Sequence, residues 1–345
     1  MNRKYDVLAK KVLSESLRVK KGESVTIETW NSGLPFALSV SAEAKRMGAI
    51  PLLTFEDEKT FVEVAKTVPA ENLGGMGGHE YALLSETDAY VFIPGPPIAT
   101  YTKLTKEQKD GSTAYNASWY EAAAKAGLRG VRMSFGYVGD HMARLLGKKK
   151  SAIVDRLLDA ALCDYGSIRK KALSVAERMG DGTTVTLSSG RERLELTLKG
   201  EPVIEDGIVD EKDIEAHRNM AYVPPGIVGM KVDPGSVNGS VKLYAPVTRL
   251  GRIEATLEFK DGRLTGREAG SRQLEKLLGS APEAARSVGF VGVGLNPALS
   301  YGYFQDRMVS GAISLILASS IGCVVAAGTL ACGNEEPVRK GRLLA

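Results

Sequence analysis

Histidine and cysteine, two residue types that often bind transition metals, are scarce in this chain of 345 residues. There are three histidines, His79, His141 and His217, and none follows position 217. The sequence contains no H-E-x-x-H pair of zinc peptidases, no Walker A loop and no G-x-S-x-G turn of α/β-hydrolases. These three kinds of enzyme site are therefore excluded.

Cysteine is also too rare for a disulfide framework, since Cys163, Cys323 and Cys332 are few and scattered. The separation of Cys323 from Cys332 does not fit a zinc knuckle, and free cysteines in an apolar run are typically small buried hydrophobic residues. The opening residues MNRKYDVLAKK lack the apolar centre of a signal peptide. Together these features indicate a cytoplasmic protein.

A strong net charge is missing as well. The chain has 45 basic and 41 acidic residues, a formal charge of +4, which argues against a nucleic-acid partner. The long uncharged run lies between Arg307 and Glu335, and four glycines and several serines interrupt it. Because buried sheets also produce continuous apolar runs, we expect strands here and no membrane span.

The first half of the chain alternates between strand-like and helix-like patterns. Helices are predicted from Pro35 to Met47 and over 115–126, and strands over 24–28, 50–55, 89–93 and 128–135. Strands that alternate with helices favour parallel pairing. We therefore predict an N-terminal doubly wound α/β domain over residues 1–150.

The second half has a different pattern of apolar and polar residues. A long helical pattern over 153–179 precedes alternating runs around Gly190, and two further hairpin signals follow at Asn238-Gly239 and Asp261-Gly262. We predict a mainly antiparallel β domain with some helix over residues 151–345, which makes the whole chain α/β plus α+β.

Three segments of the second half resemble sequence motifs of a known family. They read HRNMAYVPPGIVGMKVDPGSVNGSV at 217–241, VGVGLNPA at 291–298 and QDRMVSGAISLILA at 305–318. In this order they resemble motifs of the thermophilic aminopeptidase family (aminopeptidases T and S, and PepS). The resemblance extends over nearly the whole chain. It implies an N-terminal domain without catalytic residues, a C-terminal domain of the thermophilic aminopeptidase type, and a homodimer that encloses an internal cavity.

In that family, two glutamates and a histidine of these motifs help to bind two metal ions. The positions that match them here hold Ile227, Phe290 and Ser314, and a further glutamate falls near Arg307. A two-metal centre needs several carboxylates and imidazoles to neutralise its charge and to activate a water molecule. The substitutions therefore predict the loss of the metal site, with no metal and no cofactor bound.

Several polar residues remain in the motif region. For each of them alone a structural role is expected, such as turn capping by Asn or packing by Tyr. As a group they are the candidate ligand-binding residues: His217, Arg218, Asn219, Asn296, Tyr301, Tyr303, Gln305 and Asp306.

The sequence leaves three functions open. The first is a pseudoenzyme that binds a small molecule or short peptide in a C-terminal cavity, without hydrolysis. The second is a metal-dependent enzyme with relocated ligands, either a leucyl-type aminopeptidase or an iron enzyme, since a related branch resembles 2,5-dihydroxypyridine dioxygenase. Its ligands would come from His217, Asp306, Glu254 and Glu258. The third is a structural partner of an active paralogue.

Overall fold

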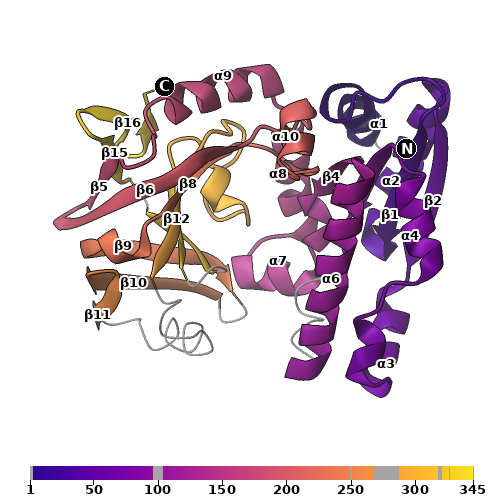
Figure 1. The fold of residues 1–345 in the computed structure, drawn as a ribbon, viewed down its shortest axis with the longest axis horizontal. Coiled ribbons are helices and arrows are strands. Elements are labelled where there is room, and N and C mark those ends of the chain that lie inside the picture. Colours follow the sequence, from indigo (N-terminus) through magenta and orange to yellow (C-terminus); the bar gives the residue numbers. More distant parts are fainter. Residues whose placement is uncertain are drawn as a thin grey trace. The chain divides into compact units, whose positions relative to one another are not determined.

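The computed structural model describes residues 3–95, 104–248, 251–267, 287–317, 321–325 and 327–344, and Figure 1 shows its fold. The chain divides into two compact units. Unit 1 comprises residues 1–144, 149–162 and 207–224, and unit 2 comprises 145–148, 163–206 and 225–345. The expected domain boundary near residue 150 stays a prediction, because compact units defined by contacts need not coincide with domains defined by sequence.

Unit 1 is built on a parallel sheet of five strands in the order β2-β1-β3-β4-β7. The strands are β1 (Ser24–Trp30), β2 (Ile50–Glu56), β3 (Ala89–Ile93), β4 (Arg129–Met133) and β7 (Met220–Val223). This is a common doubly wound order, and it reverses between β1 and β3. The predicted parallel-sheet domain and its four predicted strands are confirmed. Strand β7 was not predicted, because it has only four residues before two prolines.

The helices of this region follow from local sequence signals. Their bounds are α1 (Arg3–Lys11), α2 (Leu34–Arg46), α3 (Glu58–Thr67), α4 (Gly78–Ser85), α6 (Lys106–Ala126), α7 (Asp140–Leu146), α8 (Lys150–Ala161) and α10 (Glu211–Glu215). Pro35 lies in the first turn of α2, as predicted. Helix α6 begins with a capping box between Thr105 and Gln108 and ends at Gly127, which has a φ of 67°. Side chains of α4 and α6 pack on the sheet face that carries Tyr90 and Phe92.

Unit 2 is built on a sheet of twelve strands in the order β11-β10-β9-β14-β13-β12-β8-β6-β5-β15-β16-β17. The pairings between its strands are antiparallel, which confirms the predicted second architecture. A further pairing of β6 with β9 closes a circuit through β8, β12, β13 and β14.

The central strands of this sheet are β6 (Glu192–Glu205), β8 (Ile227–Val232), β9 (Asn238–Thr248), β12 (Val288–Gly294), β13 (Ile313–Leu317) and β14 (Ile321–Val325). The outer strands are β5 (Thr184–Ser189), β10 (Gly251–Lys260), β11 (Arg263–Arg267), β15 (Thr329–Cys332), β16 (Glu335–Arg339) and β17 (Arg342–Leu343). Val228, Met230, Val291, Val293 and Leu315 point into one apolar core together with residues of α9 (Tyr165–Ala176). The alternate residues of the same strands form the opposite face of the sheet, which we call the site face.

Two local expectations are wrong. The helical pattern over 153–179 forms two helices, α8 and α9, because Asp164 caps the start of α9 through a hydrogen bond from Ser167 N to its Oδ1 of 3.0 Å. The Asn238-Gly239 pair is no hairpin turn and lies at the start of β9. Gly239 has a φ of 106°, and a Cβ there would come within 2.2 Å of Arg193 O on β6. Close backbone approach therefore explains this glycine.

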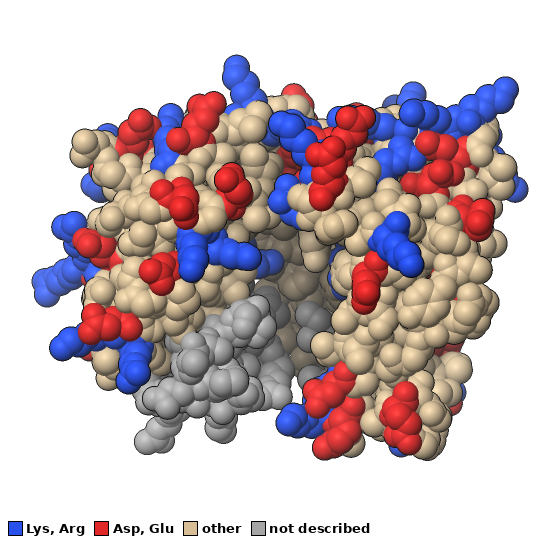
Figure 2. Space-filling model, in the orientation of Figure 1, with Lys and Arg blue, Asp and Glu red and all other residues tan. Residues whose placement is uncertain are grey.

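The other two hairpin signals are confirmed, at Gly190 between β5 and β6 and at Asp261-Gly262 between β10 and β11. The uncharged run after Arg307 forms β13, β14 and β15, in keeping with the predicted buried strands. In the described ranges no helix is long and apolar enough to cross a membrane. Acidic and basic side chains are interspersed over the visible face of the molecule (Figure 2).

Candidate functional site

Ile227, Phe290 and Ser314, which are expected from the sequence to replace metal ligands, lie together on the site face of unit 2; we call them the substituted positions. Strands β8, β12 and β13 are neighbours, and Gly292 is opposite both Gly229 on β8 and Ser314 on β13. A Cβ placed on Gly292 would lie 3.0 Å from Ser314 Oγ, 3.1 Å from Phe290 Cε1 and 3.2 Å from Ile227 Cδ1. Residues 227, 290 and 314 thus surround one backbone position, although they are far apart in the sequence.

The side chains gathered there are poorly suited to cations. Ile227 and Phe290 have no donor atoms, and Ser314 is fully buried with its hydroxyl donating to Gly292 O over 3.3 Å. Divalent metals in enzymes are held by carboxylate, imidazole or thiolate groups. The donor set at these three positions does not fit a two-metal centre. Across the described residues as a whole, no group of three or more His, Cys, Asp and Glu side chains could hold a metal ion.

The site face continues along one row of the sheet to Tyr244. Strand pairing places Gly229, Gly292, Ser314, Val324 and Tyr244 opposite one another across five strands. Opposed residues of antiparallel strands project to the same side. Tyr244 therefore shares a face with the three substituted positions, although it belongs to none of the recognised motifs.

Tyr244 is hydrogen-bonded to a buried carboxylate, that of Asp306. Its hydroxyl donates to Asp306 Oδ2 over 3.0 Å, and Asp306 is only 1% exposed. The backbone N–H of Gly302 donates to both carboxylate oxygens over 2.8 and 2.9 Å, and that of Tyr303 donates to Oδ1 over 3.2 Å. These donors fix the turn before the short helix at Asp306–Met308. Asp306 therefore has a structural role, and its oxygens already accept hydrogen bonds.

Two further tyrosines and a lysine border this turn. Tyr301 is 39% exposed and packs edge-on against Tyr244, with ring centroids 6.5 Å apart. Burial, together with the nearby charge of Asp306, raises the pKa of Tyr301. Lys148 Nζ lies 4.3 Å from the ring centroid of Tyr303, a cation–π contact within unit 2.

Arg307 also lies on the site face. A Cβ on Gly322 of β14 would come within 3.0 Å of Arg307 Cδ and 3.4 Å of its Nε. Gly322 is two residues from Val324 and so projects to the same side of the strand. The cationic side chain of Arg307 therefore lies across β14 on this face of the sheet.

The remaining candidates have structural surroundings. Asn296 is fully buried, donates to Pro225 O over 2.8 Å and accepts from Ala298 N over 3.0 Å. His217 and Arg218 are exposed residues of unit 1, and Arg218 pairs with Asp213 at 3.4 Å. Asn219, also in unit 1, is buried and donates to Leu128 O over 2.8 Å. Residues 217–219 and Asp306 thus belong to different compact units.

Among the described residues, neither the cysteines nor the other ligands considered for a relocated metal site belong to a group of three or more such side chains. Cys323 lies in the apolar core, where burial raises the pKa of its thiol to about 12. Burial likewise raises the pKa of Cys332 to about 11. Glu254 is opposite Tyr244 on β10, while His79 is exposed and His141 half-buried in unit 1.

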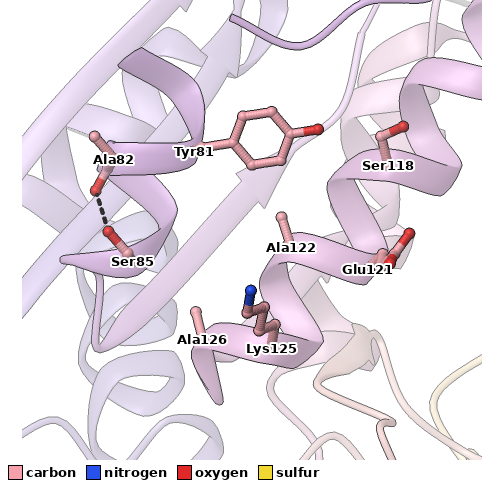
Figure 3. Close-up of a pocket in the computed structure, with 8 residues that line it drawn as sticks. All are labelled: Tyr81, Ala82, Ser85, Ser118, Glu121, Ala122, Lys125 and Ala126. Atoms are coloured by element: carbon pink, nitrogen blue, oxygen red, sulfur yellow. Dashed lines mark hydrogen bonds between the residues drawn. The ribbon is translucent and has the colours of Figure 1, made fainter. Parts of the chain in front are cut away.

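Unit 1 has a hollow of about 700 Å³ between α4 and α6 (Figure 3). Its charged side chains, Glu121 and Lys125, are exposed, and much of its wall is alanine. Ser85 donates to Ala82 O over 2.9 Å within α4. The hollow therefore has no convergent polar groups that would mark a catalytic site.

Comparisons with known proteins bear on the fold. No family model and no curated protein sequence matches the chain. Among solved structures, wild-type AmpT from Thermus thermophilus is similar with a TM-score of 0.70 and 16% identity, over 99% of each chain. A 2,5-dihydroxypyridine dioxygenase from Pseudomonas putida KT2440 has a TM-score of 0.66 and 14% identity, over 99% of this chain and 97% of that one. The two-domain fold expected from the resemblance to thermophilic aminopeptidases is therefore confirmed, at low sequence identity.

Proposed function

We propose that this protein is a pseudoenzyme with the aminopeptidase fold, which binds a small molecule or short peptide in unit 2 without metal-dependent hydrolysis. The proposal is carried by the convergence of Ile227, Phe290 and Ser314 around Gly292. The loss of one metal ligand could be compensated by a neighbouring side chain. Three such losses at one place leave the hydroxyl of Ser314 as the sole side-chain donor among these three positions. Fold alone does not determine activity, so the proposal depends on which donor atoms these three side chains provide.

The surroundings favour an organic ligand over a pair of cations. The branched aliphatic chain of Ile227 and the phenyl ring of Phe290 provide apolar contact. Tyr301, Tyr303 and Arg307 carry polar groups at the neighbouring turn. Arg307 would further repel divalent metals on the site face. Apolar walls with a few polar groups are typical of small-molecule sites. A homodimer remains part of this proposal, as the resemblance implies.

The test compares the natural chain with a variant in which the donors are restored. Metal content is measured after incubation with Co²⁺ or Zn²⁺, together with hydrolysis of leucyl-p-nitroanilide and its sensitivity to a chelator. We expect the natural chain to retain well under one metal ion per chain and to show no chelator-sensitive turnover. The triple variant Ile227→Glu, Phe290→Glu, Ser314→His should gain metal binding.

Stoichiometric metal in the natural chain with robust, chelator-sensitive hydrolysis would overturn the proposal. Peptide binding is checked separately by equilibrium dialysis with leucine-containing dipeptides. The variants Tyr301→Ala and Arg307→Ala should weaken it, and Lys260→Ala on the exposed end of β10 serves as the control.

A further inference from the structure

A second polar cluster lies within unit 1, on the sheet face that α6 covers. Parallel pairing aligns Glu28, Phe92, Arg132 and Tyr222 in one row across β1, β3, β4 and β7. The row is close to the carboxyl ends of the strands, and Glu28 and Phe92 flank the reversal of strand order between β1 and β3. In open α/β sheets this is where ligands bind.

Glu28 and Arg132, the acidic and the basic residue of this row, do not form an ion pair with each other. Glu28 and Arg132 are two strands apart, roughly 10 Å between their backbones, with Phe92 between them. Each is bonded to phenols instead. The Tyr90 hydroxyl donates to Glu28, and Arg132 donates to the hydroxyls of Tyr120 and Tyr137.

Arg132 is a cation enclosed by aromatic rings. Its guanidinium carbon lies 5.1 Å from the ring centroid of Phe92, 5.3 Å from that of Tyr137 and 6.0 Å from that of Tyr222. Within the described part of the chain it forms no ion pair, and its buried Nε–H has no hydrogen-bond partner. A half-buried guanidinium with N–H groups to spare is a strong donor for a carboxylate, which it can bind through two parallel hydrogen bonds.

A cavity of about 40 Å³ lies between Glu28 and Arg132. Its lining comes from β1, β3, β4, β7 and α6, all within unit 1: Glu28, Phe92, Tyr115, Asn116, Trp119, Tyr120, Arg132 and Met220. A buried water needs on the order of 10–15 Å³, so the space suits about three or four waters or a group of roughly three to four heavy atoms. A carboxylate with one attached carbon has that size.

We propose that this cavity binds a carboxylate group, which pairs with the guanidinium of Arg132 while Glu28 donates a hydrogen bond to it in the protonated state. The carboxylate can belong to a free small acid or to the end of a peptide. The site is distinct from the substituted positions of unit 2 and does not depend on the function proposed for them.

The surroundings of Glu28 support its role as an acid. Burial raises the pKa of Glu28 to about 7, the Tyr90 hydroxyl opposes this rise, and Glu56 and Glu80 add to it while Arg132 lowers it. Tyr115 faces the same group from α6 and donates to Glu80. A neutral Glu28 can donate a proton toward a bound carboxylate, whereas an ionised Glu28 repels it. Carboxylate affinity should therefore fall as the pH rises through about 7.

Calorimetric titration tests this on the full chain with two matched pairs of probes. Acetate and acetamide differ in charge but not in size, and N-acetylglycine and N-acetylglycinamide repeat the comparison for a peptide end. We expect saturable binding of at least one carboxylate and none of its amide. Binding of acetate identifies a small acid as the ligand, and binding of N-acetylglycine alone identifies a peptide end.

Variants assign the binding to this cavity. Arg132→Gln should lower the affinity at least about tenfold, because it removes charge-assisted hydrogen bonds, while Lys125→Gln on the exposed side of α6 should leave it unchanged. Glu28→Gln should keep the affinity and remove its dependence on pH between 6 and 8. If Arg132→Gln fails to fold, Glu28→Gln and the pH profile of the natural chain decide the question. Absence of saturable binding by both carboxylates, equal binding of the amides, or a pH profile that Glu28→Gln leaves intact would refute the proposal.

Discussion

The phenyl ring of Phe290 lies against the backbone of Gly229 on the neighbouring strand. A Cβ on Gly229 would be 2.6 Å from Phe290 Cζ and 2.3 Å from Val291 O. A Cβ on Gly292, opposite Gly229, would likewise lie close to the ring, 3.1 Å from Phe290 Cε1. Two facing glycines therefore provide the space that the ring occupies on the site face.

Replacement of Gly229 by alanine should destabilise unit 2. The added methyl group would collide with a backbone oxygen that cannot move freely, and overpacking of this kind typically costs about 1–3 kcal/mol. The free energy of unfolding, measured by urea denaturation, gives the comparison. Gly289→Ala in the same strand as Phe290 is the control, because a Cβ there would meet only Ile316 O at 3.9 Å. Equal stability of the two variants would contradict the described packing.

The carboxylate of Asp306 should contribute more to stability than the Tyr244 hydroxyl that it accepts from. Asp306→Ala leaves the Gly302 and Tyr303 amides and the Tyr244 hydroxyl without their acceptor, a loss of about 3 kcal/mol. Tyr244→Phe removes one of the several hydrogen bonds that Asp306 accepts, worth about 1 kcal/mol. Thermal and urea unfolding of both variants provide the measurement.

Asp306→Asn separates hydrogen bonding from charge in the same turn. Its amide oxygen can still accept from the two backbone N–H groups, and its amide nitrogen can donate to the Tyr244 oxygen. We therefore expect it to lose less stability than Asp306→Ala. A greater loss for asparagine than for alanine would mean that the carboxylate does not accept the bonds described.

Motif spacing predicts Ile227, Phe290 and Ser314 as the positions that match metal ligands, because each is counted from a glycine or proline of its motif, and this assignment stays a prediction. Their meeting around Gly292 depends on strand register, which no single motif encodes. Tyr244 could not be predicted for the same reason. It reaches the site face through the pairing of β9 with β14, two strands distant in the sequence.

The candidates His217, Arg218 and Asn219 are close in sequence to a motif but lie in the other compact unit. They precede the motif glycine by only a few residues, which suggested a shared site with Asp306. The next four residues form β7 and extend the parallel sheet of unit 1, where Asn219 O accepts from Gly130 N over 2.7 Å. The chain passes from one compact unit to the other between Pro224 and Pro225, so a site shared by these residues and Asp306 stays a prediction.

Glu28 should make the stability of the protein depend on pH in an unusual direction for a carboxylate. Its pKa is about 7 in the folded protein, and the ordinary value is 4.5, so the folded state holds a proton that the unfolded chain has lost. Stability from this group is complete below about pH 4.5 and declines as the pH rises to about 7. The decline is at most about 3 kcal/mol, since one pKa unit corresponds to about 1.4 kcal/mol.

Urea unfolding of the natural chain and of Glu28→Gln at pH 5 and pH 8 measures this linkage. The glutamine variant cannot ionise and should lose less stability between the two pH values. Glu86→Gln, at the exposed end of α4, controls for the change of charge. An identical pH dependence in all three proteins would show that Glu28 titrates normally.

The cysteines should differ in reactivity although all three are free thiols. Cys323 and Cys332 are buried, and burial raises the pKa of the first to about 12 and of the second to about 11, so almost no thiolate is present at pH 8. Cys163 is half-buried and should be the thiol modified first by iodoacetamide in the native protein. Peptide mapping after timed labelling gives the order, and denaturation in urea should make all three react alike. Rapid native labelling of Cys323 would place that residue outside the core of unit 2.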